Sequence, residues 1–193
     1  MSEEILDVFS GDWQGSIKKE GAATRSEVHE KNLYHKHVGV LIMNEKGELL
    51  FQRRSQNKKI NPNRWTRTGG HVDSGEHPII AAQREVKEEV GVDIPIKQFE
   101  LMGIRKVTAA GNNNYTYSYF ARVNYKLEDY TMQEEEVSEL KYMTIEEMEE
   151  EYRNGNEEYV FLKWKDFDKI IEFLKRKRDE RSIVYNEKKS DCR

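Results

Sequence analysis

Three glutamates in the middle of the chain have the side-chain type and the spacing for metal-dependent chemistry. Glu85 precedes Glu88 by three positions and Glu89 by four. On a helix, residues at these spacings lie on one side, so the three carboxylates reach a common point. Such oxygen ligands suit Mg²⁺ or Mn²⁺ and do not suit a soft metal. A solvated acidic face is the alternative, because charged helix faces are common.

The segment that carries these glutamates is predicted to be a helix over residues 78–90. Pro78 fits a first helical position, and Gly91 is placed to end the helix. Apolar residues recur within it at steps of three and four, which predicts one buried face. These residues are Ile79, Ala82, Val86 and Val90.

The helix and the loop before it together fill a longer pattern, Gly-x5-Glu-x7-Arg-Glu-Uaa-x-Glu-Glu-x-Gly-Uaa, in which Uaa is an aliphatic residue. Every fixed position is filled, over residues 70–92. So many specified positions make the match very specific. The segment resembles the Nudix box of the Nudix hydrolase family. The matching residues are Gly70, Glu76, Arg84, Glu85, Val86, Glu88, Glu89, Gly91 and Val92.

The resemblance, which extends over roughly residues 33–155, implies a fold and an activity. The family's fold is of the α/β class, an α/β/α sandwich with a mixed β-sheet. Its enzymes are hydrolases that cleave a diphosphate (pyrophosphate) bond in a nucleotide-type or other small organic diphosphate by water attack on phosphorus. The implied cofactor is Mg²⁺ or Mn²⁺, which neutralises phosphate oxygens and lowers the pKa of bound water. The implied partner is a small-molecule diphosphate substrate.

The resemblance also implies roles for residues of the box. Glu85 and Glu89 would ligate the metal, and Glu88 would be a third ligand or would orient the attacking water. The Gly70 carbonyl would complete the metal site.

Two further residues of the box would support its structure. Arg84 would hold the glutamates, and Glu76 would steady the loop and the helix through Arg84. A positioned general base typically contributes 10²- to 10⁴-fold, so one nearby carboxylate is expected in that role. The candidates are Glu88 and the acidic run 134–136, within which Glu136 is preferred because related enzymes often use a glutamate after the last long strand. A solvated acidic loop is the alternative for this run.

Residues upstream of the box resemble the isopentenyl-diphosphate isomerase branch of the same superfamily. The similar segments are 34–38, 52–55 and 70–71. In that branch a cysteine directly before Gly-His carries out protonation chemistry, but Gly69 stands at that position here. The isomerases also take two glutamates from a strand that here reads Asn-Asn-Asn-Tyr-Thr at 112–116. We therefore expect an isomerase-like Nudix hydrolase. Isomerase activity and a non-catalytic ligand-sensing module are the alternatives.

Five further side chains match functional positions of the isomerases. His35 and His71 match two metal-binding histidines, and His29 is a candidate for a third. Without the acidic partners, local hydrogen bonding is the preferred interpretation of these histidines. Arg54 and Lys58 match basic positions that meet the diphosphate, and guanidinium groups suit bidentate contact with phosphate. A solvated strand end and loop is the alternative for these two.

Strands and further helices are predicted around the box. Apolar runs bounded by turn residues predict strands at 37–43, 48–53, 99–107, 115–125 and 140–143. The first two are expected to form a hairpin around the turn at 45–47. Helices are predicted at 145–153 and 157–178, and the second has an apolar stripe from Phe161 to Leu174.

Composition excludes several classes of protein. The 193 residues carry 32 Lys+Arg and 36 Asp+Glu, and the net charge of −4 argues against a nucleic-acid-binding domain. The single cysteine, Cys192, permits neither an internal disulfide nor a cysteine-based zinc site. No apolar run is long enough to span a membrane, and the N-terminus lacks the layout of a signal peptide. We therefore expect a cytoplasmic protein that binds neither nucleic acid nor membrane.

Four segments are expected along the chain. They are an N-terminal extension at 1–32, a Nudix hydrolase core at 33–155, a C-terminal amphipathic helix packed on the core at 156–181 and a frayed tail at 182–193. The C-terminal helix has two interpretations, since its apolar stripe would cover its own core or that of a second copy in a homodimer.

Overall fold

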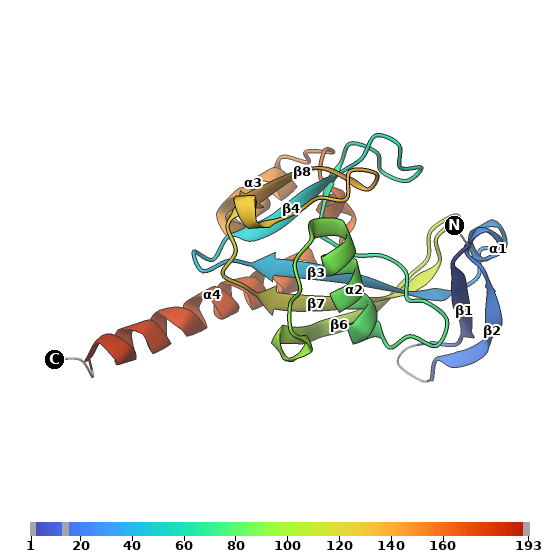
Figure 1. Ribbon diagram of the computed structural model, residues 1–193, viewed down its shortest axis with the longest axis horizontal. Coiled ribbons are helices and arrows are strands. Elements are labelled where there is room, and N and C mark those ends of the chain that lie inside the picture. The colour runs from blue at the N-terminus through green and yellow to red at the C-terminus, as the bar shows by residue number, and fades with distance from the viewer. Residues whose placement is uncertain (1–2, 13–15, 191–193) are drawn as a thin grey trace.

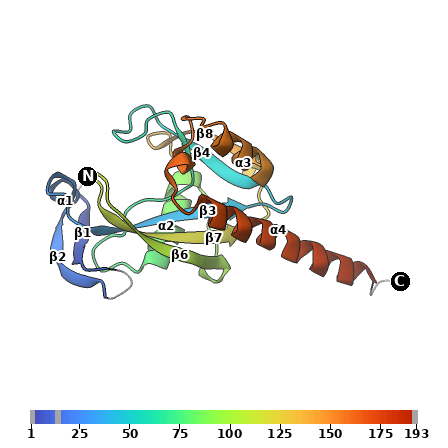
Figure 2. The same ribbon diagram turned by 180° about the vertical axis from the view of Figure 1, so that it is seen from behind.

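The computed structural model describes residues 3–12 and 16–190, and a mixed β-sheet with helices on both faces forms its centre (Figures 1 and 2). Three short 3₁₀ helices, at Ile96–Gln98, Leu127–Asp129 and Val160–Lys163, connect larger elements. The larger elements are β1 (Ile5–Ser10), β2 (Lys18–Thr24), α1 (Arg25–Glu30), β3 (His35–Met43), β4 (Leu49–Arg54), β5 (Trp65–Thr66), α2 (Pro78–Val90), β6 (Phe99–Val107), β7 (Asn114–Arg122), β8 (Val137–Met143), α3 (Ile145–Arg153) and α4 (Phe167–Ser190). The predicted fold class, an α/β sandwich with a mixed sheet, is confirmed.

The sheet consists of two parts that diverge from one another. Its strand order is β5-β4-β3-β7-β6, and β8 pairs with β4. β3 runs parallel to β7 over its whole length, and β6 runs antiparallel to β7. β3 and β4 are joined by the predicted turn, but they pair only at Met43 and Leu49. The predicted hairpin is therefore a turn between two strands that separate at once.

The loop before α2 fills the space where β3 and β4 separate. The Val40 N–H donates to the Thr68 carbonyl at 2.8 Å, and the Val38 N–H donates to the Gly70 carbonyl at 2.9 Å. Because these bonds tie the loop to β3, the start of the box is held by the sheet itself.

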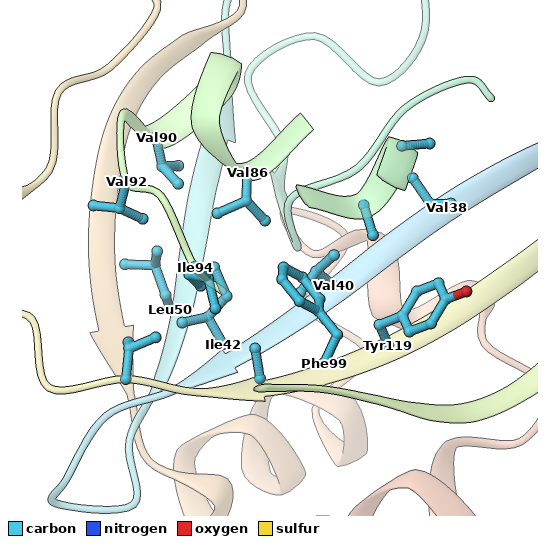
Figure 3. Close-up of a cluster of buried hydrophobic side chains, with 14 of the residues drawn as sticks. Val38, Val40, Ile42, Leu50, Val86, Val90, Val92, Ile94, Phe99 and Tyr119 are labelled. Atoms are coloured by element: carbon cyan, nitrogen blue, oxygen red, sulfur yellow. The ribbon is translucent and has the colours of Figure 1, made fainter. Parts of the chain in front are cut away.

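Helix α2 covers one face of the sheet and has the predicted bounds. The His77 side chain caps its first turn, Pro78 is its first residue, and Gly91 ends it in the left-handed conformation with φ of 75°. Its apolar face packs on β3, β4 and β7, and the cluster between them is drawn in Figure 3. Labelled members of this cluster are Val38, Val40, Ile42, Leu50, Val86, Val90, Val92, Ile94, Phe99 and Tyr119.

Helices α3 and α4 cover the opposite face, over a second buried cluster (Figure 2). α4 begins at Phe167, ten residues after the predicted start, because Val160–Lys163 forms a separate 3₁₀ helix. Phe161, Trp164 and Leu174 are all buried, as the apolar stripe predicts. An apolar stripe predicts which side chains face the core, but it does not predict whether they belong to one continuous helix or to two. α4 runs on to Ser190, through most of the stretch expected to fray, and Cys192 lies outside the described residues.

The N-terminal segment forms a hairpin of β1 and β2 that leads into α1. It packs beside the loop before α2, where the Ser74 N–H donates to the Ile5 carbonyl at 2.8 Å. The Thr24 side chain caps α1 in a reciprocal pair with Glu27. None of the helices in the described part of the chain is long and apolar enough to cross a membrane.

Candidate active site

The guanidinium of Arg84 binds most of the acidic side chains of the box. Its Nε donates to Glu76 at 3.1 Å, and one terminal nitrogen, Nη1, donates both to Glu85 at 2.9 Å and to Glu88 at 3.0 Å. A further bond of 2.9 Å reaches the His71 carbonyl in the loop. Burial lowers the pKa of Arg84, but the bonds to Glu76 and the charges of the glutamates outweigh burial and raise it overall. Arg84, with Glu76, thus joins the helix to the loop before it.

Glu89 is the most deeply buried carboxylate of the site. It is only 2% exposed, and its Oε2 accepts hydrogen bonds from the Gly69 N–H at 2.8 Å and from the Gln52 side chain at 2.9 Å. Neither contact could be read from the sequence, because nothing local singles out Gln52 within β4 and Gly69 lies outside the motif. The two bonds fix the carboxylate between α2 and the sheet.

Burial and mutual repulsion make the charged forms of Glu85 and Glu89 unfavourable. Burial is the largest cause of the raised pKa of Glu85, followed by the charge of Glu89, and Arg84 opposes both. Burial also raises the pKa of Glu89, although the bonds from Gly69 and Gln52 oppose it. Two carboxylates held in this way gain from a positive ion that binds both.

The glycines before α2 allow the loop to approach these carboxylates closely. A Cβ atom at Gly70 would overlap the Glu85 carboxylate, so a larger residue there would displace that carboxylate from its present position. A Cβ atom at Gly69, whose φ is 155°, would overlap the carbonyl of Val38. A cysteine of the isomerase kind therefore does not fit at Gly69 without a shift of the backbone. The Gly70 carbonyl accepts the Val38 N–H and keeps one lone pair for a further partner.

A family model agrees with this geometry. The model described as the NUDIX domain matches residues 33–165, more than half of the chain. The chain belongs to the Nudix family. It is 37% identical over 166 residues to Nudix hydrolase 3 of Arabidopsis thaliana, and the match covers 80% of this chain but only 20% of that protein.

Relatives of this Nudix chain include both hydrolases and isomerases. Isopentenyl-diphosphate Delta-isomerase 2 of Photorhabdus laumondii is 27% identical over 155 residues, with 80% of this chain and 85% of that protein covered. A solved structure from Deinococcus radiodurans shares the fold, with a TM-score of 0.62, 22% identity, and 79% of this chain and 90% of that chain covered. The predicted membership of the Nudix family, with likeness to its isopentenyl-diphosphate isomerases, is confirmed, and the comparisons place the isomerases as the more distant relatives.

Arg54, Lys58 and Glu136 lie together beside the Nudix box. Lys58 forms an ion pair with Glu136 at 2.7 Å, and the backbone of the same glutamate accepts the Ser55 N–H. Burial lowers the pKa of Arg54, and the charges of Glu89 and Glu136 oppose this effect. The charge of Glu136 in turn raises the pKa of Glu89. Glu88, by contrast, lies on the exposed side of α2 with its side chain 51% exposed.

The three histidines predicted from the isomerase comparison converge at one point. One ring nitrogen from each of His29, His35 and His71 lies within 4.8 Å of the others, and the Nε2 atoms of His29 and His71 are 3.0 Å apart. His35 is fully buried, and its Nε2 has no hydrogen-bond partner within the described residues. Burial lowers the pKa of His35 to about 4, so its imidazole is neutral at pH 7. The preferred interpretation, local hydrogen bonding, therefore accounts for Nδ1 of His35 but not for Nε2.

Proposed function

We propose that the protein is a divalent-metal-dependent Nudix hydrolase that cleaves a diphosphate bond of a small organic diphosphate by water attack on phosphorus. The observation that carries the proposal is the paired burial of Glu85 and Glu89, held by Arg84, Gln52 and Gly69. Burying two carboxylates side by side is costly unless a cation joins them.

The donor atoms at this site fit Mg²⁺ or Mn²⁺. Glu85, Glu88 and Glu89 supply hard oxygen ligands, and the remaining lone pair of the Gly70 carbonyl supplies another. A bound ion supplies charge neutralisation at the phosphate oxygens and a lowered pKa of water. The protein supplies position, since Arg84 aligns Glu85 and Glu88 from one side and the Gly69 N–H aligns Glu89 from the other.

Two carboxylates are proposed as candidates for the general base. Glu88 is exposed enough to meet water and is oriented by Arg84. Glu136 lies near Glu89 but shares its charge with Lys58. We assign Arg54 and Lys58 to binding of the diphosphate. Arg54 lies within reach of the charges of Glu89 and Glu136, and Lys58 pairs with Glu136, so both cations can meet phosphate oxygens beside the carboxylates. When substrate attracts Lys58, Glu136 is released to accept a proton.

The experiment is phosphate and pyrophosphate release from a panel of diphosphates with Mg²⁺ or Mn²⁺. The wild type is compared with Glu89→Gln, Glu88→Gln and Glu136→Gln, and with Glu128→Gln, an exposed glutamate far along the chain, as the control. Glu89→Gln is expected to reduce kcat by at least about 10²-fold. Of Glu88→Gln and Glu136→Gln, the variant that removes the general base is expected to reduce kcat by about 10²- to 10⁴-fold. Unchanged turnover in Glu89→Gln refutes the proposal, and tight binding without turnover in either metal supports a sensing role instead.

A further inference from the structure

A cavity of about 630 Å³ lies on the face of the sheet opposite α2. Its walls come from β6, from Ser118 of β7 and from the first turns of α4, which is in front of these strands in Figure 2. α4 lies beyond residues 33–165, so this chain completes the cavity with a helix outside the matched family domain.

The cavity holds an excess of positive charge. Arg67, Arg105, Lys169 and Arg176 line it, against only two carboxylates, Asp166 and Glu172. Four cations and two anions leave a formal charge of +2 among the lining residues. Arg176 also forms an ion pair with Glu180 outside the lining at 3.7 Å, so Arg67 and Arg105 carry most of this excess. A cavity with this charge attracts an anionic group.

Arg67 is the cation most in need of a partner. Its guanidinium donates to the Ser118 hydroxyl at 3.1 Å and lies 4.6 Å from the centre of the Trp164 ring. Neither Arg67 nor Arg105 forms an ion pair with a carboxylate in the part of the chain that the structure describes. Burial, and then the charge of Arg105, lower the pKa of Arg67 to about 9. A partly buried guanidinium without a carboxylate partner loses hydration and gains from a bound anion.

The cavity adjoins the carboxylate site through two glycines. A Cβ atom at Gly39 would overlap the Arg67 guanidinium, and Gly69 packs directly against Gly39. On its other side, the Gly69 N–H donates to Glu89. The guanidinium and the carboxylate therefore flank the same pair of glycines, and Arg67 is only three positions before Gly70 in the chain.

We propose that this cavity takes the organic part of the substrate, and that this part carries its own anionic group, a carboxylate or a phosphate, which pairs with Arg67. This inference rests on the diphosphate hydrolysis proposed above. An apolar prenyl chain would leave Arg67 and Arg105 without a counter-charge, whereas an acidic group satisfies them. The substrate is thus an organic diphosphate with a second, remote negative charge.

Two pairs of compounds test the proposal, because the members of each pair differ in one group. UDP-glucuronate and UDP-glucose differ in a carboxylate, and coenzyme A and dephospho-coenzyme A differ in a phosphate. Two readouts are used: hydrolysis with Mg²⁺ or Mn²⁺, and calorimetric binding to metal-free protein, which needs no turnover. The wild type is expected to prefer the acidic member of at least one pair by about tenfold or more. The pair that shows the preference distinguishes carboxylate from phosphate.

Substitutions of the cavity arginines then test whether the preference for the acidic compound depends on the cavity. Arg67→Gln is expected to bring the ratio within the pair close to one, because the acidic member loses its counter-charge. Arg105→Gln, on the edge strand β6, is expected to reduce the ratio in part, and it keeps the test valid if Arg67→Gln fails to fold. Arg64→Gln, which removes a cation paired with Glu157 outside the cavity, is the control and should leave the ratio unchanged.

The outcomes separate this proposal from the hydrolase assignment. A preference in binding that depends on Arg67 or Arg105, without any hydrolysis, supports the anion site and contradicts the proposed activity. Hydrolysis with equal rates within both pairs supports the activity and overturns the anion site. A preference that persists in both arginine variants, or an absence of both binding and hydrolysis, also overturns the anion site.

Discussion

At the scale of single residues, the site depends on the shape of Arg84 as much as on its charge. One planar guanidinium donates to Glu76, Glu85 and Glu88 and also to the His71 carbonyl. A lysine ammonium has three rotatable donors on a flexible stem and cannot reproduce that set.

Arg84→Lys is therefore expected to lower kcat/KM by about 10- to 100-fold, the usual effect of losing a residue that orients metal ligands. Steady-state kinetics measure the change, and circular dichroism shows whether the fold persists. Lys87→Arg, an exposed substitution on the same helix, is the control. Equal kcat/KM in Arg84→Lys and wild type would show that charge alone suffices.

Metal-free Glu89→Gln is expected to be more stable than the wild type at pH 8. Burial raises the folded-state pKa of Glu89 above its ordinary value of 4.5, so the native state binds more protons than the unfolded state above that pH. The stability of the metal-free wild type therefore falls as pH rises, and removing the charge recovers about 1 to 3 kcal/mol at pH 8 but little at pH 4. Urea unfolding with a chelator measures this difference.

The same unfolding measurement with added Mg²⁺ or Mn²⁺ tests whether Glu89 binds the ion. An ion that binds only the native state raises the free energy of unfolding of the wild type. The same ion is expected to raise that of Glu89→Gln much less. A variant that is no more stable than the wild type at pH 8, or that gains equally from metal, contradicts the interpretation of the site.

At the scale of elements, the sequence predicts a helix or strand boundary correctly where a residue such as proline or glycine marks it. Pro78 and Gly91 mark both ends of α2. The glutamate spacing brings Glu85 and Glu88 to the guanidinium of Arg84, whereas Glu89 is buried against Gln52 and Gly69. The start of α4 has no such mark, and the separation of β3 from β4 leaves no local trace because each strand alone has an ordinary apolar pattern. Gln52 and Arg67 take their places because β3 and β4 separate and admit the loop between them. The sequence alone does not show this separation, so it could not predict the contacts of these two residues.

Gly39 of β3 lies against Gly69 of the loop and against the Arg67 guanidinium, which leaves little room for a larger side chain. Gly39→Ala is expected to destabilise the protein by about 1 kcal/mol, because the added methyl overlaps the Arg67 guanidinium and shifts it toward the cavity that it lines. Gly21→Ala in β2 is the matched control, since its Cβ would meet nothing within 4 Å. Thermal or urea unfolding of both variants checks this, and equal stabilities would contradict the close contact.

At the scale of the whole molecule, the N-terminal segment is joined to the Nudix domain through histidines. His29 from α1 meets His71 of the loop, and both pack against the ring of His35. Because burial lowers the folded-state pKa of His35 to about 4, against 6.5 ordinarily, the unfolded chain binds more protons between these values. Stability is thus complete above pH 6.5 and is lost as pH falls below it.

The wild type is expected to lose about 2 kcal/mol through His35 between pH 7 and pH 5. His35→Gln lacks this titration, so the stability difference between the two proteins should shrink by that amount over the same range. Chemical unfolding with a chelator at both pH values tests the expectation. A difference that stays constant would show that His35 accepts a proton without cost in the folded state.

The pair of glycines lies between Arg67 and Glu89, so in the proposed reaction the group that would recognise the substrate and the group that would cleave it stand on different residues. Substitutions on the α4 side change the charge and shape of the cavity without touching a carboxylate of the box. Descendants of this protein can therefore acquire new substrates by altering one wall while inheriting the bond-breaking chemistry unchanged on the other.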